Sequence, residues 1–120
     1  MISIAVVGAG AWGKNHIRVF SELPEVRLKY ICDSDSSKWS SLQKAYPQVQ
    51  IVEDLTPILH DEEVRGVVVA SSAISHHSLS KEILSADKDV LVEKPMALTS
   101  KDAEEMVTIA EKRKRILMVG

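Results

Sequence analysis

A carboxylate, an ammonium group and a proline stand in a row at Glu93, Lys94 and Pro95, directly after the aliphatic run Val90–Val92. Such a run is typical of a strand that is buried on both faces. Unpaired charges are costly in a core, so this turn fits the carboxyl end of a strand, where an open α/β sheet binds its ligand. The alternative is a polar turn that happens to contain Glu and Lys.

A second stretch has the residues needed to bind a dinucleotide. Gly8, Gly10 and Gly13 form a G-x-G-x-x-G pattern between an apolar strand and a helix. The first glycine allows a tight turn, the second lets a pyrophosphate approach the backbone, and the third lets helix and strand pack closely. The helix N-terminus at Ala11 and Trp12 offers free N–H groups to the phosphates. A purely structural turn is the alternative for the glycines.

Asp33 ends the second predicted strand, roughly 20 residues after the glycines, where an acidic residue accepts hydrogen bonds from the adenosine ribose. Its charge should repel a 2′-phosphate, so the sequence favours NAD over NADP and argues against coenzyme A, which carries a ribose 3′-phosphate. A nearby cation such as Lys38 would instead tolerate NADP. Asp33 could also cap the following helix, although Asp35 is placed to do so.

These residues must be positioned by strands and helices that alternate along the chain. Strands are predicted at residues 2–7, 27–32, 50–52, 66–70, 90–92 and 116–119. Helices are predicted to end near residues 23, 45, 60 and 86, and the last one within the basic run 112–115. Thr56 is expected to cap the third helix, with Pro57 at its first position. Thr99 is expected to cap the last helix, which carries Met106 and Val107 on its apolar stripe. We expect one Rossmann domain over residues 1–120, a doubly wound parallel six-stranded α/β sheet in strand order 3-2-1-4-5-6 with helices on both faces.

Composition limits the class of protein. The 120 residues are 45% hydrophobic with a net charge of −2, which predicts a globular domain and argues against nucleic-acid or anionic-membrane partners. No apolar run approaches the roughly 20 residues that a membrane helix needs. The single cysteine excludes an internal disulfide and fits a cytoplasmic protein. The cysteine and the four histidines show no zinc-ligand spacing, so no metal site is predicted.

Taken together, these motifs resemble the N-terminal half of the glucose-fructose oxidoreductase / inositol dehydrogenase family (Gfo/Idh/MocA) over essentially the whole chain. The matching residues are Gly8–Gly13 with His16, Cys32 with Asp33, Val67–Ser71 with His76, and Glu93–Pro95. The run Trp12–His16 also resembles members that act on nucleotide sugars, such as UDP-N-acetylglucosamine 3-dehydrogenases. The resemblance implies hydride transfer between NAD and a hydroxyl of a sugar, polyol or nucleotide sugar.

The resemblance also implies roles for the residues of the two later motifs. Lys94 would reach the nicotinamide ribose and the substrate and assist proton transfer at the reacting hydroxyl. Glu93 would contact the cofactor or orient the lysine, and Pro95 would fix the turn, where the resemblance allows a cis as well as a trans bond before it. Ser71 and Ser72 would line the nicotinamide ribose. The family usually has Thr-Pro or Thr-Asn-Pro here, so this loop is expected to be less fixed.

Other residues have more than one interpretation. His76 aligns with a family histidine, and its alternative is a helix residue satisfied by local backbone; His77 is expected to face solvent. Trp12 would cover the pyrophosphate turn or pack on a neighbouring loop, with a substrate contact as the alternative. His16 is interpreted as structural, and Cys32 as a small buried hydrophobe.

Members of the family carry a second α/β domain that binds the substrate and supplies, typically, an aspartate and a histidine. The 120 residues do not contain it. We therefore expect the cofactor domain of a longer, homo-oligomeric enzyme acting on a small molecule, inactive as this chain alone. A naturally short protein, a non-catalytic nucleotide-binding module and one half of a split enzyme are the alternatives.

Overall fold

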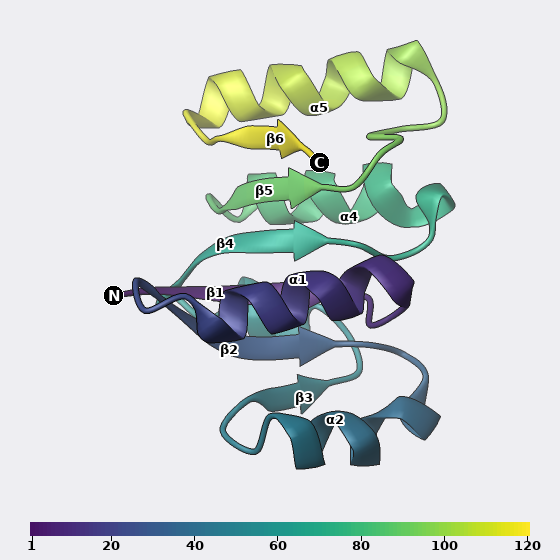
Figure 1. The fold of residues 1–120 in the computed structure, drawn as a ribbon. Coiled ribbons are helices and arrows are strands. Elements are labelled where there is room, and N and C mark those ends of the chain that lie inside the picture. Colours follow the sequence, from purple (N-terminus) through teal and green to yellow (C-terminus); the bar gives the residue numbers. More distant parts are fainter.

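A computed structural model describes all residues 1–120 and contains one six-stranded sheet. The strands are β1 (Ile2–Val7), β2 (Val26–Cys32), β3 (Gln50–Val52), β4 (Val64–Val69), β5 (Asp89–Val92) and β6 (Leu117–Val119). All neighbours pair in parallel, in the order β3-β2-β1-β4-β5-β6 (Figure 1). The predicted fold and strand order are confirmed.

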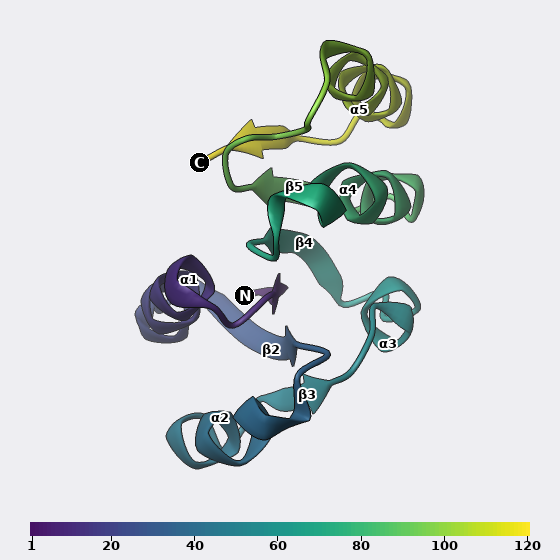
Figure 2. The same ribbon diagram turned by 90° about the vertical axis from the view of Figure 1, so that its right-hand side faces the viewer.

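Five helices cover the two faces of this sheet. They are α1 (Ala11–Glu22), α2 (Trp39–Ala45), α3 (Thr56–Leu59), α4 (His76–Ser85) and α5 (Ser100–Arg113). Short 3₁₀ turns, η1 (Ser36–Lys38) and η2 (Ala73–Ser75), lead into α2 and α4. Figure 2 shows α1 and α2 on one face of the sheet and α3, α4 and α5 on the other. None of these helices has the length and apolar character required to cross a bilayer.

Alternating side chains of the central strands build a core on each face. In β1, Ile4 and Val6 pack with Ile17 of α1, whereas Ala5 and Val7 belong to the larger core beneath α3, α4 and α5. This alternation follows from the two-residue period of a strand. Both faces of the sheet are therefore covered by helices, and a ligand can bind at the edge where the strands end.

Two helix caps differ in their outcome. The Thr99 hydroxyl accepts a hydrogen bond from the Asp102 N–H at 3.1 Å, which confirms the predicted cap of α5. The prediction for Thr56 was wrong, because α3 already includes this residue and the Asp54 carboxylate accepts its N–H at 2.9 Å. A carboxylate two residues upstream reaches that N–H directly, so the threonine hydroxyl is not needed.

Two hydrophobic positions near the sheet edge were also misplaced. Val107 of α5 was expected to face the core with Met106, but its side chain is 43% exposed while Met106 is fully buried. Ile116 was expected in the last strand, yet it precedes β6 and is 67% exposed. β6 is the edge strand of the sheet, so no further strand covers this side of the core.

A polar network joins side chains of β2 to the residues just before the amino ends of β4 and β5. The Asp61 carboxylate accepts hydrogen bonds from the Tyr30 hydroxyl at 2.7 Å and pairs with the Lys29 ammonium at 2.6 Å. The buried Lys88 ammonium donates to the Asp61 and Val64 carbonyl oxygens at 2.7 and 2.8 Å. We call these side chains, Lys29, Tyr30, Asp61 and Lys88, the amino-end network.

Candidate functional site

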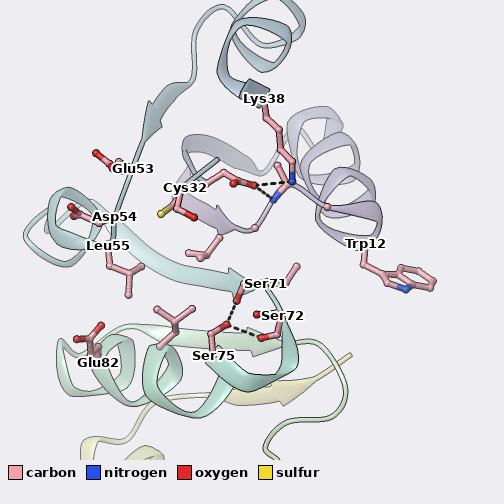
Figure 3. Close-up of a pocket in the computed structure, with 18 of the residues that line it drawn as sticks. Trp12, Cys32, Lys38, Glu53, Asp54, Leu55, Ser71, Ser72, Ser75 and Glu82 are labelled. Atoms are coloured by element: carbon pink, nitrogen blue, oxygen red, sulfur yellow. Dashed lines mark hydrogen bonds and ion pairs between the residues drawn. The ribbon is translucent and has the colours of Figure 1, made fainter. Parts of the chain in front are cut away.

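A cavity of about 840 Å³ opens at the carboxyl ends of β1, β2 and β4 (Figure 3). It lies where the strand order reverses, with β2 on one side of β1 and β4 on the other. Such a switch point is where open α/β sheets bind ligands. The lining includes these residues singled out from the sequence: Gly8, Gly10, Ala11, Trp12, Asp33, Ser71 and Ser72.

The three glycines differ in what surrounds them. Gly8 has a φ of +96°, and an added Cβ would lie 2.6 Å from the Ser71 nitrogen. A Cβ on Gly13 would overlap the Gly8 carbonyl oxygen, so Gly13 packs α1 against β1 and does not line the cavity. A Cβ on Gly10 would meet nothing within 4 Å. Each environment fits the role predicted for that glycine.

The helix that follows begins without a side-chain cap. Gly10 is the N-cap residue of α1 and has no side chain to accept the first N–H groups, which leaves them available to a ligand. Trp12 lies in this first turn. Its side chain is 63% exposed and points outward (Figure 3), so the packing on a neighbouring loop that the sequence suggested is not observed.

Asp33 is joined to the glycine loop through its own carboxylate. Oδ2 accepts the Ala9 N–H at 2.8 Å, and Oδ1 accepts the Asp35 N–H at 2.8 Å. The capping role falls to Asp35, whose carboxylate accepts the Ser37 N–H at 3.0 Å. This is the outcome that leaves Asp33 facing the cavity. The Lys38 ammonium, also in the lining, lies 3.5 Å from Asp33 Oδ2.

Hydrogen bonds hold the loop after β4, where the family usually has a proline. The Ser71 and Ser75 hydroxyl oxygens are 2.6 Å apart, and the Ser75 hydroxyl also donates to the Ser72 carbonyl at 2.7 Å. His76 lies within 2.8 Å of the Ser71 carbonyl through Nε2. The loop that was expected to be less fixed is therefore tied down by side chains in place of a proline.

The Glu93-Lys94-Pro95 turn follows β5 and lies outside the cavity lining, one strand beyond β4. The Lys94–Pro95 bond is cis. The Glu93 carboxylate lies 2.6 Å from His16 Nε2. The carbonyl of Pro95 lies 2.8 Å from His76 Nδ1. The fold thus brings the turn beside α1 and the Ser71 loop, both of which border the cavity.

Sequence reasoning missed the partner of Glu93. His16 was interpreted as structural, yet 77 positions separate it from the carboxylate that it contacts. The only signal was its position one turn after the glycine motif. His76 was expected either to match a family histidine or to be satisfied by local backbone; it contacts the nearby Ser71 carbonyl and also the distant Pro95 carbonyl.

One cluster of potential metal ligands arises from the fold alone. Ligand atoms of His77, Asp102 and Glu105 all lie within 4.8 Å of one another, although no spacing in the sequence indicated it. His77 was expected to face solvent, but its Nε2 lies 2.6 Å from Glu105. Hydrogen bonds from His77 and Lys81 lower the pKa of the Glu105 carboxyl. The cluster is thus already an ion-pair network between α4 and α5.

Comparison with known proteins agrees with this geometry. The profile of the Gfo/Idh/MocA family, described as an oxidoreductase family with an NAD-binding Rossmann fold, matches residues 2–120. The chain is 34% identical over 107 residues to an inositol 2-dehydrogenase of Paenarthrobacter aurescens, covering 88% of this chain and 32% of the relative. It is 30% identical over 115 residues to a D-apiose dehydrogenase of Paraburkholderia graminis, covering 96% of this chain and 31% of the relative.

A solved structure gives the same result. GenD2 from gentamicin A biosynthesis, in complex with NAD, superposes with a TM-score of 0.94 at 32% identity, covering 99% of this chain and 34% of that one. The chain thus spans about a third of the length of the proteins it matches. It belongs to the Gfo/Idh/MocA oxidoreductase family and forms that family's NAD-binding Rossmann domain.

Proposed function

We propose that this domain binds NAD for an oxidoreductase that transfers a hydride between the nicotinamide and a hydroxyl of a sugar, polyol or nucleotide sugar. The observation that carries the proposal is that Gly10, Asp33 and the turn with Lys94 lie at the same edge of the sheet. All three follow the carboxyl ends of strands in one parallel sheet, around its switch point. Relatives named as inositol and apiose dehydrogenases support this substrate class.

In this proposal the residues hold the cofactor in a line along the sheet edge. The pyrophosphate lies over Gly10 and the first N–H groups of α1, and the adenosine ribose lies at Asp33. Ser71 and Ser72 contact the nicotinamide ribose. Bound NAD supplies the hydride acceptor, while the protein supplies position and electrostatics.

NAD is proposed over NADP because of the charges around the ribose position. Asp33, Glu53 and Asp54 all line the cavity there, against the single ammonium of Lys38. Three carboxylates repel a 2′-phosphate, and Lys38 is already paired with Asp33. An NADP enzyme would need the opposite balance.

Lys94 is the proposed proton-transfer residue. It is exposed and takes part in no side-chain hydrogen bond or ion pair, so its ammonium is free to meet a substrate hydroxyl. Positioned proton transfer of this kind typically raises an enzymatic rate by about 10²- to 10⁴-fold. Glu93 and Pro95 shape the turn that presents it.

Activity in this proposal needs more chain than these 120 residues. The relatives are about three times as long, and the remaining part would bind the substrate and add further catalytic groups. We propose a cytoplasmic homo-oligomer acting on a small molecule. The alternative, a nucleotide-binding module without catalysis, predicts cofactor binding but no turnover by the full-length protein.

Calorimetric titration of the chain with NAD, NADH, NADP and NADPH tests the proposal. Binding of NAD and NADH in preference to the phosphorylated cofactors is expected. The preference should weaken in Asp33→Ala. An unchanged preference in that variant would remove Asp33 from the cofactor site, and binding of none of the four cofactors would contradict the proposal.

A further inference from the structure

The Lys94 side chain has no partner, but the residues on both sides of it do. Its place is therefore set by the backbone of the turn, from Glu93 to Pro95. The Glu93 N–H donates to the Val69 carbonyl at 3.0 Å, which fixes the start of the turn against β4. Two further contacts of the turn come from the side chains of His16 and His76.

His16 holds the first end of the turn. Its Nε2 lies 2.6 Å from Glu93 Oε1, and the two side chains are only 19% and 16% exposed. The His16 ring also stacks on Phe20 one turn further along α1, with the ring centroids 6.4 Å apart. A hydrogen bond to a carboxylate is among the stronger kinds, and partial burial strengthens it further. Glu93 is thereby tied to the helix that begins at the glycine loop.

His76 holds the second end. Its side chain is 2% exposed, and its ring lies between two backbone carbonyls: Pro95 at 2.8 Å from Nδ1 and Ser71 at 2.8 Å from Nε2. Carbonyl oxygens only accept hydrogen bonds, so a neutral ring donates to one of them and a doubly protonated ring to both. A ring that carries a proton on Nδ1, in the neutral or the doubly protonated form, therefore joins the turn to the helix and loop that follow β4.

We propose that His16 and His76 are positioning residues that hold the two ends of the Glu93-Lys94-Pro95 turn and so aim Lys94. The inference rests on the proposed role of Lys94 in proton transfer. Both histidines reach the turn from elements that border the cofactor cavity, α1 and the Ser71 loop. The turn is thus held in register with the groups proposed to carry the cofactor, and a small displacement of a catalytic group is costly.

Amide hydrogen exchange in the full-length protein tests whether the two histidines hold the turn, and it does not depend on enzymatic activity. In His16→Leu, exchange of the segment 93–98 should become about tenfold faster, because a charge-assisted hydrogen bond is lost. His16→Gln, which keeps an N–H donor, should exchange like the wild type. His76→Leu should likewise make exchange of the segment 93–98 faster. If that variant does not fold, His76→Asn, which keeps one donor, takes its place in the experiment. His77→Leu, one residue away, is the control and should leave the segment unchanged.

Steady-state kinetics then test the aim of Lys94. His16→Leu should lower kcat for oxidation of a sugar or polyol by about 10²-fold. The affinity for NADH, measured by calorimetry, should not fall in parallel, and His16→Gln should recover most of kcat. A general structural role would instead lower stability, NADH affinity and kcat together. Wild-type protein that binds NAD but turns over no alcohol would contradict the proposed function. The exchange data would still show whether the two histidines hold the turn. Unchanged exchange of residues 93–98, or unchanged kcat with faster exchange, would overturn the inference.

Discussion

The backbone N–H of Ala9 donates to Oδ2 of Asp33 at 2.8 Å, across 24 positions of the sequence. The bond joins the middle of the glycine loop to the residue that directly follows β2. Asp33 therefore shapes the loop proposed to hold the pyrophosphate and also faces the cavity where the ribose is proposed to bind. A substitution at Asp33 consequently acts on both parts of the proposed cofactor site.

Substitution of Asp33 should change the preference between NAD and NADP. Asp33→Ser removes a carboxylate and leaves the Lys38 ammonium unpaired, so affinity for NADP relative to NAD should rise about tenfold or more. Calorimetry with both cofactors measures this. The double variant Asp33→Ser, Lys38→Ala should lose the gain; if it keeps the gain, Lys38 is not the group that attracts the phosphate.

Gly8 and Gly10 should separate stability from binding. Gly8→Ala places a Cβ 2.6 Å from the Ser71 nitrogen at a φ of +96°, and should lower the free energy of unfolding by more than about 2 kcal/mol. Gly10→Ala meets nothing within 4 Å and should change it by less than about 0.5 kcal/mol, while weakening NAD binding. Urea denaturation and calorimetry test the pair. Equal stability losses in the two variants would contradict the different environments described above.

The acid stability of the domain should depend on Asp61. The hydrogen bond from Lys29 holds the pKa of this carboxyl at about 2, below its ordinary 3.8. Because the folded-state pKa is lower, the unfolded state binds more protons, so the stabilisation is complete above pH 3.8 and is lost as the pH falls toward 2. Asp61→Asn should be less stable at neutral pH and should lose less stability on acidification. Melting temperatures between neutral and acidic pH measure this, with exposed Glu104→Gln as the control.

Cys32 should be inert although it lines the cavity. Burial raises the pKa of its thiol to about 11, with further contributions from the charges of Asp54 and Asp33. The thiolate is the reactive form, so labelling of native protein by a disulfide reagent at pH 8, which is about three units lower, should be slow. Labelling in urea should be fast. Rapid labelling of the folded protein would show that this end of β2 opens readily.

Local patterns in the sequence predicted much of this structure. Aliphatic runs bounded by turn residues identified the strands, and the glycine spacing identified the first turn, because both depend on chemistry within a few residues. Contacts between distant elements were not predictable in this way. The pairing of His16 with Glu93 and the double contact of His76 depend on how α1, β4 and β5 are placed side by side. Thr56 shows a local failure, where a nearby carboxylate replaced the expected cap.

The position of the amino-end network has a consequence for protein engineering. Its residues Asp61 and Lys88 precede the amino ends of β4 and β5, whereas Gly10, Asp33 and Lys94 follow the carboxyl ends of β1, β2 and β5. Substitutions more than about 10 Å apart with no shared partners usually have additive effects. Cofactor selectivity can therefore be redesigned at one edge while thermal tolerance is improved at the other. The two sets of changes can be developed in separate libraries and then combined.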